Sequence, residues 1–124
     1  TDEWKKRGVR EGKEFAILTD EISKATFGKS VQEYKQLKSL KKENLRDHMN
    51  DLELIFSMLG EKATTEITKA VNSNGLEECK DSAQKGGKIA GDARFALEQQ
   101  TNQNVVTSEN YLEEQEKVKR KKLK

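Results

Sequence analysis

Proline is absent from this chain of 124 residues, and aromatic residues make up only 6% of it. The absence of proline removes the residue that most often breaks helices and fixes loop conformations. Charged residues, by contrast, make up 37% of the chain. This balance favours exposed helices around a thin aliphatic core, and it argues against a β-sandwich or an enzyme with a deep pocket.

Cysteine and histidine each occur once, as Cys79 and His48. A lone cysteine cannot form an intrachain disulfide, so the composition gives no sign of an oxidising compartment. Metal sites require three or four converging ligands, and nucleophilic catalysis requires a base held beside the nucleophile. We therefore expect a non-enzymatic protein without a metal or cofactor. We expect His48 on the shoulder of a helix and Cys79 as a small buried hydrophobic residue.

Long apolar runs are absent as well. None approaches the roughly 20 residues that a transmembrane helix requires. The first residues, Thr1–Lys13, are polar and charged, unlike a signal peptide. The sequence therefore predicts a cytoplasmic protein of bacterial type that has no contact with a membrane.

The spacing of apolar residues predicts an all-α fold of about five helices. The strongest pattern predicts a long helix over about 44–71, with Asn44 as its N-cap and an apolar stripe that faces the core. Gly60 lies within this helix and permits a kink or break. The stripe comprises Leu45, Met49, Leu52, Phe56, Leu59, Ala63, Ile67 and Val71, and it is widened by Leu54, Ile55 and Met58.

A turn at Asn72–Gly75 precedes a second long helix over about 76–101, and we expect the two long helices to pack antiparallel. The predicted inward face is rich in small residues, which permit close approach of the two backbones. It comprises Leu76, Cys79, Ala83, Gly86, Gly87, Ala90, Ala93 or Arg94, and Leu97. The glycines over 86–91 do not match a phosphate-binding loop, because the G-x-x-x-x-G-K-[ST] spacing and a preceding strand are missing.

Shorter helices flank the long pair. The segment from Glu14 to Phe27 has helical spacing, although a short strand at Phe15–Leu18 is the competing interpretation. Gly28 is a stop signal, and Ser30 with Glu33 forms a capping box for a short following helix. We expect these N-terminal helices to pack across the long pair within one domain over 1–112. A final helix from Glu109 leads into a charged, partly disordered tail over 113–124.

The net charge is only +2, but positive charge is concentrated in one internal segment. The basic residues of this segment are Lys29, Lys35, Lys38, Lys41, Lys42 and Arg46, against Glu33 and Glu43. Such residues bind phosphates in a salt-dependent and sequence-independent way, and Tyr34 is a candidate for stacking on a base. The alternative is a solvated lysine-rich surface. The basic tail over 117–122 is more typical of a solvating end than of a ligand site.

Several segments fit one family pattern. It begins with Glu3–Val9 and Gly12–Thr19, continues with Tyr34-Lys35 and the block Leu40–Leu54, and ends with Thr64–Ile67, Gly86-Gly87, Ala90–Arg94, Leu97-Glu98 and Val105-Val106. Together these segments resemble the C-terminal half of the DNA-damage-inducible protein D family. The resemblance spans nearly the whole chain, and the Leu40–Leu54 block is its most specific part.

The resemblance implies a regulatory role in the bacterial SOS response, exerted on RecA-type recombinase filaments and on single-stranded DNA. The family's N-terminal domain, which is similar to Bro-type antirepressors, is expected to be missing from this chain. The family offers neither a catalytic motif nor mapped binding residues to transfer. Two further hypotheses stay open: a direct DNA-binding module that uses the basic segment, and a homodimerisation domain that serves the N-terminal domain.

Overall fold

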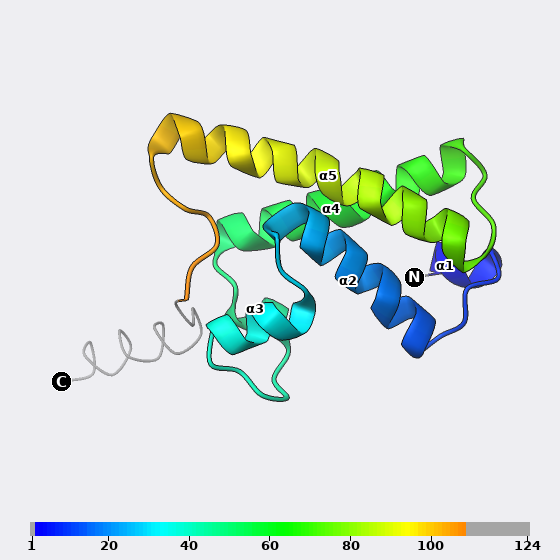
Figure 1. Ribbon diagram of the computed structural model, residues 1–124, viewed down its shortest axis with the longest axis horizontal. Helices are drawn as coiled ribbons and strands as arrows, with labels where there is room; N and C mark the ends of the chain where they lie inside the picture. Colours follow the sequence, from blue (N-terminus) through cyan, green and yellow to red (C-terminus); the bar gives the residue numbers. More distant parts are fainter. Residues whose placement is uncertain (1, 109–124) are drawn as a thin grey trace.

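The computed structural model describes residues 2–108, which form five α-helices and one 3-10 helix without a strand (Figure 1). The elements are α1 (Asp2–Lys6), α2 (Lys13–Phe27), α3 (Val31–Leu37), the 3-10 helix η1 (Leu45–His48), α4 (Asp51–Ala70) and α5 (Gly75–Thr101). The predicted all-α fold of about five helices is confirmed. The expected final helix from Glu109 and the charged tail over 113–124 lie outside the described residues.

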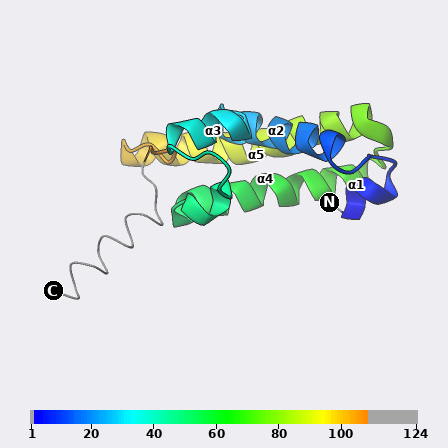
Figure 2. The ribbon, with the colours of Figure 1, turned by 90° about the horizontal axis from the view of Figure 1, so that it is seen from below.

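The central element of the fold is α5, because it packs against both α4 and α2. α4 and α5 run side by side in opposite directions and are joined by a short turn, as the sequence predicted (Figure 1). Figure 2 shows α2, α3 and α5 in one layer and α4 in a second layer, with α1 near one end of α4. One side of α4 is therefore covered by the other layer, and its opposite side is not.

α5 approaches both neighbours through glycines. A Cβ atom added to Gly86 would lie 2.6 Å from the Cα atom of Thr64 in α4. A Cβ atom added to Gly87 would lie 2.8 Å from the carbonyl oxygen of Ile22 in α2. Real Cβ atoms essentially never come so close, so backbone packs directly against backbone at both contacts. The small-residue inward face predicted for this helix is confirmed, since Cys79, Ala83, Gly86, Gly87 and Ala90 are all buried.

Two separate apolar clusters lie at either end of this glycine contact. The first contains the buried residues Phe27, Tyr34, Leu40, Leu45, Met49, Phe56 and Val105. The second contains Trp4, Val9, Leu18, Ile22, Cys79 and Ala83. Val105 is buried and Val106 packs against the first cluster, so this pair anchors the chain after α5, as predicted.

The predicted end of α2 and the predicted start of α3 both rest on residues that are close in the sequence, and both are confirmed. Gly28 adopts the left-handed conformation, with φ 75°, and ends α2. Ser30 Oγ accepts a hydrogen bond from the Glu33 amide at 3.2 Å, and the Glu33 carboxylate accepts one from the Ser30 amide at 3.0 Å. The predicted capping box is thus confirmed. Residues 15–18 are helical, so the strand interpretation was wrong.

The predicted start of the long helix at residue 44 is wrong. Asn44 caps only the short η1, and the chain is extended at Met49 and Asn50 before α4 begins at Asp51. The cause is a second capping box, in which Asn50 accepts a hydrogen bond from the Glu53 amide at 2.8 Å and its own amide donates to the Glu53 carboxylate at 3.1 Å. Gly60 does not interrupt α4.

The predicted inward stripe of this helix is wrong in part. Phe56 is buried as expected, but Leu52, Ile55, Met58, Leu59 and Val71 are exposed. The buried residues of α4 are instead Glu53, Phe56, Gly60, Thr64 and Thr68. The reason is the glycine contact, because only small side chains fit where the backbone of α5 lies against α4.

Lys38 was predicted to be part of a basic surface, and this prediction is wrong. Its side chain is fully buried, and Nζ lies 2.9 Å from Oε1 of Glu53, which is also fully buried. The Tyr34 hydroxyl donates a hydrogen bond to the other carboxylate oxygen of Glu53. Burial forces this pairing, since an uncompensated buried charge is strongly destabilising. The three side chains connect α3 to the first turn of α4.

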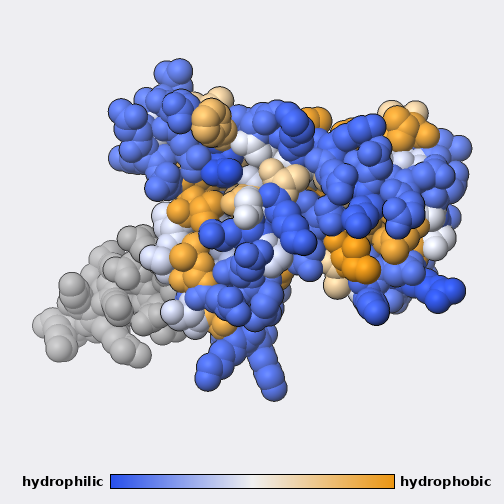
Figure 3. Space-filling model, viewed as in Figure 1, coloured by the Kyte–Doolittle hydropathy of each residue, from blue (hydrophilic) through white to orange (hydrophobic). Residues whose placement is uncertain are grey.

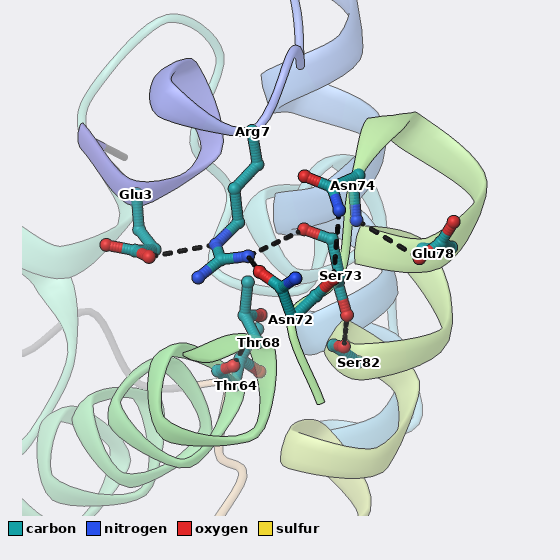
Figure 4. Close-up of polar contacts among 9 residues, drawn as sticks. All are labelled: Glu3, Arg7, Thr64, Thr68, Asn72, Ser73, Asn74, Glu78 and Ser82. Carbon is teal, nitrogen blue, oxygen red and sulfur yellow. Dashed lines mark hydrogen bonds and ion pairs between the residues drawn. The ribbon is translucent and has the colours of Figure 1, made fainter. Parts of the chain in front are cut away.

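Arg7 makes a comparable connection at the other end of the molecule (Figure 4). Its guanidinium donates to Glu3 at 2.8 Å, to the Asn72 side chain at 2.9 Å and to the Ser73 carbonyl at 3.0 Å. The Gly75 amide donates to the Arg7 carbonyl at 2.7 Å. The segment after α1 is therefore held to the turn between α4 and α5.

Substitution of Gly86 by alanine tests the backbone contact. Without a clash, glycine to alanine within a helix stabilises a protein by about 0.5–1 kcal/mol. Because the added Cβ would overlap Thr64, we expect Gly86→Ala to lower the free energy of unfolding by about 1–3 kcal/mol. Urea unfolding measures this change, and Lys85→Ala, on the exposed side of α5, is the matched control. A stabilised Gly86→Ala variant would contradict the contact.

Removal of first one charge and then both charges tests the buried ion pair. We expect Lys38→Met to lower the free energy of unfolding by about 3–5 kcal/mol, because it leaves the Glu53 carboxylate buried without its cation. Adding Glu53→Gln to this variant removes the charge and should recover part of the loss. Lys41→Met, at an exposed position, should change stability little. Equal, small effects of Lys38→Met and Lys41→Met would show that Lys38 is not buried.

Candidate functional site

A groove runs between α2 and α4 and encloses a volume of about 700 Å³. α2 contributes Thr19, Ile22, Ser23 and Thr26 to it, and α4 contributes Ser57, Glu61 and Thr65. Glu3 and Trp4 of α1 line it as well, together with residues from α3, η1 and the segment between them. The lining is therefore mixed. Hydroxyl-bearing residues of α2 and α4 alternate with apolar surface, which comes from Trp4, Ile22, Phe27, Val31, Leu45 and Met49.

Three basic residues of the groove come from three different parts of the chain. Lys35 belongs to α3, Lys42 to the segment after it, and Arg46 to η1. Arg46 forms an ion pair with Glu61 of α4, and both side chains are nearly half exposed. The fold thus brings together three of the six residues that were predicted to bind an anion. We refer to Lys35, Lys42 and Arg46 as the basic end of the groove.

The other three predicted residues do not line the groove. Lys38 is buried against Glu53. Lys29 is half-buried, and its carbonyl oxygen accepts a hydrogen bond from the Ser23 hydroxyl at 2.6 Å. Lys41 is exposed, and its amide donates to the Glu43 carboxylate at 2.8 Å. The predicted continuous basic surface is therefore divided by the fold.

Two carboxylates near the groove remain ionised to lower pH than usual. Hydrogen bonding from the Arg7 guanidinium lowers the pKa of Glu3, and the cation Arg7 adds a charge interaction in the same direction. The Lys41 backbone amide lowers the pKa of Glu43. Glu3 is paired with Arg7, which is not part of the basic end. Its negative charge therefore offsets the positive charges of Lys35 and Lys42 little. Within residues 2–108, Glu61 is the carboxylate in ion-pair contact with a residue of the basic end.

The three cationic side chains give the groove a means of binding anions. Among the described residues, no group of three or more His, Cys, Asp or Glu side chains could hold a metal ion. His48 lies in η1 and does not line the groove. Cys79 is buried away from it, and burial raises the pKa of its thiol, which agrees with the expected role as a small hydrophobic residue. Three cationic side chains along one groove suit an extended anionic ligand.

Sequence reasoning missed the hydroxyl-bearing walls. Thr19 and Ser23 are four residues apart in α2, and Ser57, Glu61 and Thr65 follow the same spacing in α4. Residues four apart share one face of a helix. These polar faces were therefore visible in the sequence, but nothing in the sequence indicated that they would face a common space.

Within residues 2–108, no helix combines the length and the apolar character needed to cross a membrane. Comparison of the chain with protein-family models, with curated proteins and with solved structures finds no match. The resemblance to the DNA-damage-inducible protein D family stays a prediction from the sequence motifs.

Proposed function

We propose that this chain is a non-enzymatic, cytoplasmic interaction module of the bacterial DNA-damage response that binds single-stranded DNA and acts on recombinase filaments. One observation carries the proposal: Lys35, Lys42 and Arg46 come from separate elements and converge at one end of a groove with a mixed polar and apolar lining. The assignment to the DNA-damage response is supported by the motifs that resemble the DNA-damage-inducible protein D family.

The basic end suits the phosphate backbone of a nucleic acid. Lysine and arginine side chains neutralise phosphates and release counterions, which supplies affinity without reading the base sequence. The hydroxyl groups of Ser23 and Ser57, on opposite walls of the groove, already donate within the protein, to the Lys29 carbonyl oxygen and to Met49 Sδ. The contacts to phosphate therefore come from the three cationic side chains. Binding of this kind accepts any single-stranded sequence, as a protein that acts along recombinase filaments requires.

The ion pair between Arg46 and Glu61 does not oppose this role. Both side chains are nearly half exposed, and exposed ion pairs contribute little to stability, about 0–1 kcal/mol. A phosphate group can therefore replace Glu61 as the partner of Arg46 at small cost. Exchange of the two anions would leave the fold unchanged, since η1 stays attached to the core through the buried Leu45.

The test compares two triple variants of equal charge on a fluorescent single-stranded oligonucleotide. One variant, Lys35→Gln with Lys42→Gln and Arg46→Gln, removes the basic end. The control, Lys13→Gln with Lys85→Gln and Lys88→Gln, removes three exposed lysines elsewhere. We expect the first to weaken binding at least tenfold and to reduce the slope of log affinity against log salt by about 2, as expected for three lost contacts on a single strand.

The same measurement on an oligonucleotide coated with recombinase separates the two parts of the proposal. If the basic end contacts DNA within the filament, the first triple variant loses binding to both naked and coated DNA. Binding to the coated form alone would assign the contact to the recombinase. Absence of binding at low salt to either form, or equal losses in the two triple variants, would overturn the proposal.

A further inference from the structure

α4 exposes a contiguous apolar surface on the side that faces away from the other helices. Leu52, Ile55, Met58 and Leu59 are exposed to 41%, 56%, 59% and 37%. We refer to these four residues as the outer face of α4. α5 and α2 pack against the opposite side of the helix, where Phe56, Gly60 and Thr64 are buried (Figure 2).

This surface differs from the other exposed apolar residues of the described chain. Its four members lie within about two helical turns at spacings of three and four residues, which places them side by side. Ile89 and Phe95 of α5 are also exposed, but they lie six positions apart and do not share one face of the helix. The face presented by α2, α3 and α5 is largely hydrophilic (Figure 3). Contiguous exposed apolar surfaces mark interaction sites, whereas single exposed residues do not.

The charged residues at the two ends of the outer face indicate which kind of molecule binds to it. Asp51 lies at its N-terminal end and Lys62 at its C-terminal end, and both are exposed. Positions 51, 55, 59 and 62 are separated by four, four and three residues, so both charges project from the same side of α4 as Ile55 and Leu59. The surface therefore has Asp51 at one end, apolar residues in the middle, and Lys62 with its ion-pair partner Glu66 at the other end.

Such a surface is complementary to an inverted copy of itself. In an antiparallel pair with the two-fold axis midway between Ile55 and Leu59, each Ile55 lies level with Leu59 of the second copy. Asp51 then lies about 1.5 Å along the helix axis from the level of Lys62 of the second copy, which brings opposite charges together twice. A parallel pair would place Asp51 beside Asp51 and Lys62 beside Lys62. A two-fold interface requires this kind of self-complementarity.

We propose that the outer face of α4 is a homodimer interface in which two copies pack antiparallel, with Ile55 against Leu59 and Asp51 paired with Lys62. Lys62 now lies 3.3 Å from Glu66 in its own helix, an exposed pair that exchanges partners at small cost. Four apolar side chains per copy form a small interface compared with stable dimers, which bury about 1,200–2,000 Å². The dimer is therefore reversible and forms at high protein concentration.

Sedimentation velocity of the full chain over a range of concentrations tests the interface. We expect a concentration-dependent monomer–dimer equilibrium for the unaltered chain. Ile55→Glu should be monomeric at every concentration, whereas Phe95→Glu, which places the same charge at an equally exposed site on α5, should dimerise as before. Circular dichroism checks that both variants are folded. A monomeric unaltered chain, or loss of the dimer in Phe95→Glu but not in Ile55→Glu, would overturn the proposal.

A charge exchange tests the antiparallel orientation. Asp51→Lys alone places like charges beside each other in the dimer and should weaken it severalfold. Asp51→Lys combined with Lys62→Asp restores opposite charges at both ends and should recover the dimer. Failure of the double variant to recover any association, in a protein that is still folded, would contradict the antiparallel arrangement.

Discussion

At Gly86, Gly87 and Gly91, the backbone of α5 lies against the backbones of α4 and α2 with no side chain between them. Two helices therefore reach α5 at the same level, and large apolar residues are displaced to the ends of the contact. They gather there as two separate clusters. Each end also has its own polar connection, made by Arg7 at one end and by the buried pair of Lys38 and Glu53 at the other.

The same contact determines which sides of α4 remain available for binding. Gly60 and Thr64 must face α5 and α2, because larger residues do not fit. This rotation directs Ser57 and Glu61 towards the groove and turns Ile55 and its apolar neighbours outwards. The groove and the outer face are thus two consequences of one packing constraint. They occupy different sides of α4, so a dimer through the outer face would carry two basic ends.

Most features that depend on neighbouring residues could be predicted from the sequence, and features that depend on distant residues could not. The capping box of Asn50 and Glu53 is a local feature that was nevertheless missed. The capping box at Ser30 and the small-residue face of α5 were predicted because their causes lie within a few positions. The stripe on α4 was not, because the largest apolar residues of a helix are inward only when the partner has room for them. Lys38 was misplaced because its partner, Glu53, lies 15 residues away. Which of the six predicted basic residues meet in the groove also depends on distant parts of the chain. The sequence therefore did not show that Lys35, Lys42 and Arg46 would be the three that line it.

Amide hydrogen exchange, measured residue by residue by NMR, tests most directly whether the glycine contact is the centre of the fold. Exchange is slowest where opening requires global unfolding. We expect the slowest amides over residues 83–91 of α5 and in the segments of α2 and α4 that face them, and faster exchange in α1, α3 and η1. Exchange over 83–91 as fast as in α1, with the slowest amides elsewhere, would contradict the account.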